Sequence, residues 1–267
     1  MINKIYLVEI IDSDIKKMLE REFILTNKIE EANILITRNI KVNKEFIDKA
    51  QKLELVCIHG TGISEVDIDY LHQKNIKVFN TPYMNVEAVA EYAIKLAFEA
   101  SRLTGYCLNE KKAAILGYGH IGKRIHELLA PFNMDISIFK RGDNLENVLK
   151  DKDYVFLALS LNESTYQIIN EESLKFFKKG AVLINIARGD LVCEDALIKS
   201  LKCNDISWYF SDVFHNEPNI NKELLKLNVF ASSHIASNMK DTLYKMGYQI
   251  YKGIKDYLEN NKIDFEL

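Results

Sequence analysis

The chain has 267 residues, of which 48% are hydrophobic and 27% are charged, and its formal net charge is −3 at pH 7. This length fits one or two globular domains, and high apolar content with a small net charge disfavours intrinsic disorder. The slight negative charge argues against a basic face that binds nucleic acid. No window approaches the roughly 18 apolar residues of a membrane-spanning helix, so we expect neither a nucleic-acid partner nor a membrane segment.

The cysteines and the N-terminal residues predict a cytoplasmic protein. Cys57, Cys107, Cys193 and Cys203 show no CxxC spacing and are too sparse for a disulfide framework. The first twenty residues lack the long apolar core of a secretory signal peptide. We therefore expect reduced thiols, and the sequence indicates no metal site.

Short apolar segments alternate with amphipathic stretches along the whole chain. A first series of predicted strands lies at 5–11, 34–36, 53–59 and 76–79. A long helix is predicted over 86–103, with Asn85 as its N-cap. A second series of predicted strands lies at 113–119, 136–139, 153–159, 180–186, 208–214 and 229–234. The last predicted helix covers 239–261.

This alternation predicts an α/β fold with parallel sheets, because strands that alternate with helices form βαβ units. Two series of strands imply two Rossmann-like or flavodoxin-like domains, with a cleft between them. The last helix follows the second series and can pack back on the first domain. We therefore predict a discontinuous substrate-binding domain of residues 1–84 and 239–267, and a dinucleotide-binding domain of residues 85–238.

A glycine-rich turn follows the first predicted strand of the second series. It has the spacing GxGxxG, with Gly117, Gly119 and Gly122, and its remaining residues include His120 and Ile121. Such glycines allow a tight turn and the close approach of a pyrophosphate, which lies at the N-terminus of the following helix. The strand before the turn and the amphipathic helix after it favour a dinucleotide site, in which His120 and Ile121 approach the cofactor through backbone atoms.

The residues after the next predicted strand bear on the choice of cofactor. In NAD-binding forms of this motif, an acidic residue about 20 positions after the first glycine binds the ribose 2′-hydroxyl. Here Lys140 and Arg141 occupy that place, and cations suit a 2′-phosphate. We therefore expect NADP as the cofactor, with NAD possible. The alternative is that both are solvated loop cations and that cofactor choice is relaxed.

Several further segments follow in a recognisable order. They are Asn185–Val192 (NIARGDLV), Asp212–Pro218 (DVFHNEP) and Ser233–Ala236 (SHIA), preceded by His59–Ile63 with Asp67, and by Asn80–Pro82 with Asn85 and Val89–Glu91. Together with the dinucleotide turn, they resemble the signatures of the D-isomer-specific 2-hydroxyacid dehydrogenase family. The resemblance covers nearly the whole chain. It implies hydride transfer between NAD(P)H and C2 of a small 2-oxo acid, giving the D-2-hydroxy acid, in a homodimer.

The resemblance also implies roles for individual residues. Arg188, Glu217 and His234 are the expected catalytic residues: the arginine binds the carboxylate and carbonyl oxygen of the 2-oxo acid, the histidine is the general acid, and the glutamate orients the histidine. Asp212 corresponds to the family's acid near the nicotinamide, and Ile186 and Ala187 are expected to contact the cofactor. Backbone N–H groups of Thr61 and Gly62 are expected to bind the substrate carboxylate. His59, beside this loop, either contacts an acidic end of the substrate or has a structural role, which we favour.

The sequence departs from the family pattern in three places. Ser160, expected to face the cofactor, stands where relatives usually have proline, and Ser232 and Ser233 replace a Thr-Pro pair. The connection between Arg102 and Lys111 is much shorter than in relatives, where it helps to build the dimer.

Two other functions remain open at this point. A nucleotide-sensing regulator or corepressor on the same scaffold would keep the cofactor site, although no added peptide-binding segment is visible. A formate-type dehydrogenase is disfavoured, because Glu217 would be unusual there. Turnover on a panel of 2-oxo acids would separate an enzyme from a regulator.

Overall fold

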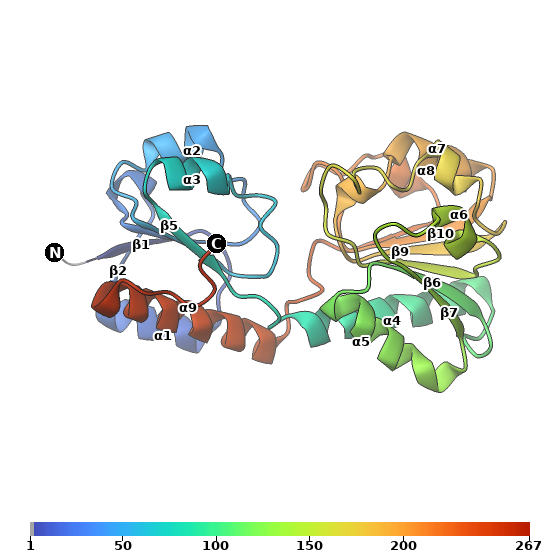
Figure 1. The fold of residues 1–267 in the computed structure, drawn as a ribbon, viewed down its shortest axis with the longest axis horizontal. Coiled ribbons are helices and arrows are strands. Elements are labelled where there is room, and N and C mark those ends of the chain that lie inside the picture. The colour runs from blue at the N-terminus through green and yellow to red at the C-terminus, as the bar shows by residue number, and fades with distance from the viewer. Residues whose placement is uncertain (1–2) are drawn as a thin grey trace. The chain divides into compact units, whose positions relative to one another are not determined.

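The computed structural model describes residues 3–267, so that Met1 and Ile2, which the first predicted domain includes, lie outside the described residues. The chain forms two compact units. The first contains the described residues up to Asn85 together with Asn238–Leu267, and the second contains Val86–Ser237. Each unit has its own all-parallel sheet (Figure 1), which confirms the predicted fold class.

The first unit has a five-stranded sheet with the order β2-β1-β3-β4-β5, which is the order of flavodoxin-like folds. Its strands are β1 (Lys4–Leu7), β2 (Ile24–Thr26), β3 (Ile34–Thr37), β4 (Leu55–Ile58) and β5 (Lys77–Asn80). One face is covered by α2 (Lys44–Lys49) and α3 (Ile68–Gln73), and the other by α1 (Ser13–Glu22) and α9 (Lys240–Asn260) (Figure 1).

Helix α9 belongs to the first unit although it follows the last strand of the second unit in sequence. Its Ile250 and Ile254, spaced by one helical turn, are fully buried in a cluster that includes Ile15 of α1. Gly253 permits close packing on β5, because a Cβ at that position would lie 2.5 Å from the Phe79 ring. Burial of this apolar stripe explains why the C-terminal helix packs with the N-terminal strands.

The second unit has a six-stranded sheet with the order β11-β10-β9-β8-β6-β7. Its strands are β6 (Lys112–Leu116), β7 (Asp135–Phe139), β8 (Tyr154–Leu157), β9 (Ala181–Asn185), β10 (Ile206–Ser211) and β11 (Val229–Ala231). One face is covered by α4 (Val86–Thr104) and α5 (His120–Leu129), and the other by α6 (Leu145–Leu149), α7 (Glu171–Leu174) and α8 (Glu194–Lys202) (Figure 1). Every residue of β8 and β9 is buried, as expected for central strands covered on both faces.

The structure corrects three local predictions in the first unit. The strand predicted over 5–11 ends at Leu7, because the Glu9 carboxylate accepts N–H bonds from the turn at 38–40 and Asp12 already caps α1. The edge strand β2 was not predicted, since it has only three residues and follows directly after α1. Asn85, the predicted N-cap of α4, instead accepts a hydrogen bond from the Thr61 hydroxyl at 2.9 Å.

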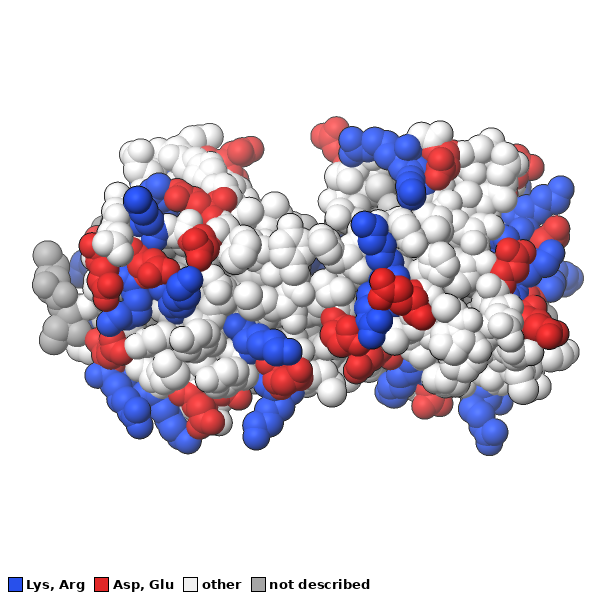
Figure 2. All heavy atoms as spheres, turned by 60° about the horizontal axis from the view of Figure 1, so that its bottom comes forward, with Lys and Arg blue, Asp and Glu red and all other residues white. Residues whose placement is uncertain are grey.

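The surface face drawn in Figure 2 carries acidic and basic side chains in alternation, without an extended basic area. In the part of the chain that the structure describes, none of the helices is both long and apolar enough to cross a membrane. Across residues 3–267 there is also no group of three or more His, Cys, Asp or Glu side chains that could hold a metal ion.

Candidate active site

The segments that the sequence singles out in the second unit begin where strands end. Gly117 follows β6, Lys140 follows β7, Ile186 follows β9 and Asp212 follows β10, while His234 lies shortly after β11. Since all six strands run parallel, these positions lie along one edge of the sheet. The strand order reverses between β6 and β8, and open α/β sheets bind ligands outside the carboxyl ends of their strands at such a reversal.

The turn between β6 and α5 needs glycine at two positions and leaves open space at a third. Gly117 has a φ of +99°, and a Cβ there would lie 2.5 Å from the Ala158 carbonyl oxygen. A Cβ on Gly122 would lie 2.0 Å from the Gly117 carbonyl oxygen. A Cβ on Gly119, the N-cap of α5, would meet no atom within 4 Å. Because the first N–H groups of a helix lack partners within it, this space fits the pyrophosphate of a dinucleotide.

Lys140 lies beside the turn and is held by its neighbours. Its N–H donates to the Asp143 carboxylate at 2.7 Å, and its Nζ lies 5.3 Å from the centre of the Tyr118 ring. The Tyr118 hydroxyl is hydrogen-bonded to His126 Nδ1 of α5 at 2.8 Å. Lys140 and Arg141 are both exposed. Two cations at the carboxyl end of β7 therefore face solvent, where an anionic ligand can reach them.

Other predicted cofactor residues occupy the same edge. His120 and Ile121 form the first turn of α5, the former exposed and the latter half-buried. Ser160 is exposed in the loop after β8, where its carbonyl oxygen accepts the Thr165 hydroxyl at 2.7 Å. Ile186 is buried at the end of β9. Their contact with a cofactor stays a prediction.

The buried side chain of Asn185 shapes the loop that carries Arg188. Asn185 Nδ2 donates to the Arg188 carbonyl oxygen at 2.9 Å and to the Tyr209 hydroxyl at 3.2 Å, and its Oδ1 accepts the Ala187 N–H at 3.0 Å. Burial raises the pKa of the Tyr209 phenol to about 12, so this partner is neutral at pH 7. Arg188 is half-buried, and its Nη1 donates to the Ala187 carbonyl oxygen at 2.6 Å. Asn185 thus fixes the backbone from which the guanidinium projects.

Gly189 brings the Arg188 loop against the loop that follows β10. A Cβ on Gly189 would lie 2.0 Å from the Phe214 carbonyl carbon. The same two loops are joined by His215 Nδ1 and the Asp190 carboxylate, which lie 2.5 Å apart. Sequence reasoning assigned no role to Asn185 or Gly189, although both stand in the NIARGD segment that it singled out.

Asp212 is 1% exposed, and both of its carboxylate oxygens bind the segment that follows β11. Oδ1 accepts the Ser232 hydroxyl at 2.6 Å and the Ile235 N–H at 2.9 Å, and Oδ2 accepts the Ala236 N–H at 2.8 Å. The Asp212 carbonyl oxygen accepts the His234 N–H at 2.8 Å. These bonds hold His234 at a φ of +54°, a left-handed conformation that costs a non-glycine residue of order 1 kcal/mol. Asp212 therefore supports the histidine, and its placement beside the nicotinamide stays a prediction.

The His234 ring is paired with Glu217. Nδ1 lies 3.2 Å from Glu217 Oε2, while Glu217 Oε1 accepts the Phe214 N–H at 2.5 Å. The side chains of His234 and Glu217 are 27% and 30% exposed, so the pair remains accessible. A carboxylate that holds Nδ1 fixes the ring orientation and directs Nε2 away from itself, as a general acid–base histidine requires.

In the first unit, Thr61 and Gly62 lie in the loop after β4. The Thr61 carbonyl oxygen accepts Asn80 Nδ2 at 3.0 Å, and its hydroxyl donates to Asn85, so the loop is anchored at two points. His59, just before this loop, is 2% exposed, and burial lowers the pKa of its imidazole to about 4. A neutral, buried imidazole supports the structural role over contact with an acidic substrate.

Comparison with known proteins assigns the family. The family model described as D-isomer specific 2-hydroxyacid dehydrogenase, NAD binding domain, matches residues 83–236. The glyoxylate reductase of Pyrococcus horikoshii is 34% identical over 262 residues, which cover 83% of this chain and 78% of that protein. The chain belongs to the D-isomer specific 2-hydroxyacid dehydrogenase family. This confirms the resemblance read from the sequence motifs.

A second relative agrees with this assignment, and a solved structure shares the fold. The hydroxypyruvate reductase of Thermotoga maritima is 28% identical over 259 residues, covering 85% of each chain. The NADPH-dependent glyoxylate/hydroxypyruvate reductase of Sinorhizobium meliloti shares the fold, with a TM-score of 0.87 over 100% of this chain and 97% of that chain, at 23% identity.

Membership of the family gives the activity. The protein is a dehydrogenase that uses a nicotinamide cofactor to interconvert a 2-oxo acid and its D-2-hydroxy acid by hydride transfer at C2. The glycine turn at the N-terminus of α5 fits that cofactor. The comparisons give no support to a regulator that lacks turnover.

We expect alanine to act differently at two glycines of the turn. Gly122→Ala should lower the free energy of unfolding by at least about 2 kcal/mol, because its Cβ would overlap a backbone oxygen. Gly119→Ala should change it by less than about 1 kcal/mol, yet weaken dinucleotide binding about tenfold or more because the methyl group enters the pyrophosphate space. Urea unfolding and calorimetric titration with NADPH and NADH measure both effects. Equal stability losses, or unchanged affinity in Gly119→Ala, would contradict this view of the turn.

Proposed function

We propose that this dehydrogenase reduces a small 2-oxo acid of the glyoxylate or hydroxypyruvate type, with Arg188 and His234 acting on the substrate and Glu217 positioning the histidine. The observation that carries the proposal is the His234–Glu217 pair, held beside the carboxyl ends of β10 and β11. The substrate class is supported by the names of the glyoxylate and hydroxypyruvate reductases to which the chain is similar.

The chemistry places two demands on the protein, because hydride addition at C2 leaves negative charge on the attached oxygen. The bound dihydronicotinamide supplies the hydride. Arg188 binds the substrate carboxylate and the C2 oxygen, and its positive charge stabilises the oxygen as charge develops. His234 donates a proton from Nε2 to the same oxygen, while Glu217 keeps the ring oriented through Nδ1. In the oxidation direction, the same imidazole accepts the proton.

We further infer how the two units divide the work. Cofactor binding is assigned to the second unit, through the turn at 117–122 and the carboxyl edge of the sheet, where Ser160, Ile186, Ala187 and Asp212 lie. Substrate-carboxylate binding by backbone N–H groups is assigned to Thr61 and Gly62 in the first unit. A homodimer in the cytoplasm is also inferred.

The arrangement around Lys140 favours NADPH. The Tyr118 ring and the Asp143 carboxylate hold Lys140 at the carboxyl end of β7, with the exposed Arg141 next to it. A 2′-phosphate brings negative charge that two cations bind well, whereas neither cation can accept a hydrogen bond from a free ribose diol.

Removing either proposed substrate-binding side chain should abolish most turnover. His234→Gln and Arg188→Ala should each lower kcat for glyoxylate reduction by about 10²- to 10⁴-fold. Both variants should retain the wild-type circular dichroism spectrum and NADPH affinity. The matched control is His72→Gln, because His72 lies in the first unit and has no role in the proposal. A folded His234→Gln or Arg188→Ala variant with near-wild-type kcat on glyoxylate and hydroxypyruvate would refute the mechanism.

Reversing the charge at Lys140 should change cofactor choice. Loss of a charge-assisted hydrogen bond is worth about 1.5–3 kcal/mol. The ratio of kcat/KM for NADPH to that for NADH should therefore fall at least about tenfold in Lys140→Asp. Lys150→Asp, an exposed lysine at the end of α6, should leave the ratio unchanged. Equal ratios in wild type and Lys140→Asp would show that cofactor choice is relaxed.

A further inference from the structure

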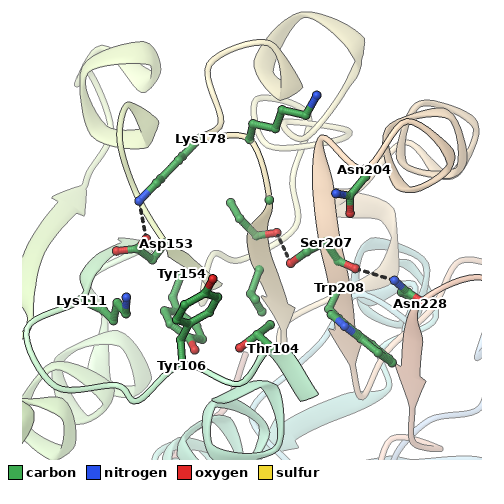
Figure 3. A pocket seen from close by; sticks show the side chains of 14 residues that line it. Thr104, Tyr106, Lys111, Asp153, Tyr154, Lys178, Asn204, Ser207, Trp208 and Asn228 are labelled. Atoms are coloured by element: carbon green, nitrogen blue, oxygen red, sulfur yellow. Dashed lines mark hydrogen bonds and ion pairs between the residues drawn. The ribbon is translucent and has the colours of Figure 1, made fainter. Parts of the chain in front are cut away.

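The second unit has a cavity of about 560 Å³ on the edge of its sheet opposite the candidate active site. The walls come from the amino ends of β8, β9 and β10 and from the connection between α4 and β6 (Figure 3). The strands of this sheet have three to six residues. At about 3.3 Å per residue, the longer strands place the amino edge of the sheet roughly 15 Å from its carboxyl edge. The cavity is therefore distinct from the site that holds the glycine turn and His234.

Its size and its rings suit a small aromatic ligand. Small-molecule sites typically enclose about 300–1,000 Å³. Tyr106, 65% exposed, extends into the middle of the cavity in Figure 3, and the half-buried Trp208 lies at one side. Exposed rings of this kind offer flat faces on which a planar group can stack.

The one carboxylate of the cavity is already neutralised by a neighbouring lysine. Asp153 accepts a hydrogen bond from Lys178 Nζ at 2.6 Å (Figure 3). It also accepts the Lys112 N–H at 2.9 Å. Burial opposes the charged form, yet these two hydrogen bonds hold the pKa of Asp153 below its usual value. The carboxylate therefore stays ionised, and its charge cancels that of Lys178.

Two further lysines leave the cavity with an excess of positive charge. Lys111 Nζ lies 4.9 Å from the centre of the Tyr106 ring, and Lys179 lies on the opposite wall, at the turn before β9. The lining of the cavity thus carries more positive than negative charge. A cavity lined by both lysines and aromatic rings is suited to ligands that combine a planar ring with negative charge.

We propose that this cavity is a second ligand site, for a planar aromatic ring that carries an anionic group and has the size of a nucleoside monophosphate. The ring stacks on Tyr106 and Trp208, and the anion binds Lys111 and Lys179. Because the cavity lies on the opposite edge of the sheet, its ligand binds to protein that is already saturated with NADPH.

Trp208 is the only tryptophan of the chain, so its emission reports directly on the cavity. We would titrate the full-length, NADPH-saturated protein with AMP, adenosine and inorganic phosphate while exciting the indole. AMP should change the emission saturably, and adenosine and inorganic phosphate should each bind at least about tenfold more weakly, because each lacks one half of the interaction.

Matched variants test the two lysines. The double variant Lys111→Ala/Lys179→Ala should raise the Kd for AMP at least about tenfold and keep the wild-type kcat, whereas Lys199→Ala, an exposed lysine of α8, should change neither. If the double variant is poorly folded, Lys179→Ala alone should still raise the Kd for AMP at least about threefold. Three results would each overturn the proposal. They are the absence of a saturable emission change with AMP, binding of adenosine or inorganic phosphate as tight as that of AMP, and a lysine variant that binds AMP as tightly as Lys199→Ala does.

Discussion

The buried carboxylate of Asp212 is the group on which the candidate site of the second unit depends. It accepts three hydrogen bonds from the segment after β11, and the backbone of the same residue accepts a fourth, from His234. An ionised side chain is costly to bury unless such bonds replace water. The bonds also offset the cost, of order 1 kcal/mol, of the left-handed backbone conformation of His234.

The other loops of the site are built onto this support. Glu217 is anchored to its own loop through the Phe214 N–H and reaches His234 with its second oxygen. Gly189 and the Asp190–His215 pair tie that loop to the loop of Arg188. Three loops from three adjacent strands thus fix one another. The groups proposed to bind charge and move a proton are held by the protein's own contacts, as electrostatic catalysis requires.

The sequence predicted the features that depend on local pattern. Apolar strands such as β8 and β9, the glycine turn at 117–122 and the positions of Arg188, Glu217 and His234 at strand ends all follow from periodicity and motif order. The strand β2 gave no comparable signal, because a three-residue edge strand has no period to detect. Asn85 shows a further limit, since a hydroxyl 24 residues away took the place of the predicted cap contact.

The supporting contacts could not be predicted, because they join residues that are distant in sequence. Asp212 reaches Ser232 and Ala236, and Asn185 reaches Tyr209. The cavity at the amino edge of the second sheet is still harder to predict from the sequence. Its walls come from the amino ends of several strands, and no motif links Tyr106 to Trp208. In each case the information lies in the register of the parallel sheet rather than in any short segment.

The kcat of Asp212→Asn at saturating NADPH and glyoxylate tests the central claim most directly. An amide keeps the size of the side chain but replaces one acceptor oxygen by an NH2 group. This NH2 group cannot accept a hydrogen bond from a backbone N–H group of the His234 segment. If Asp212 acts by holding His234, kcat should fall by about 10²-fold or more. A folded Asp212→Asn enzyme that turns over at the wild-type rate would contradict the account.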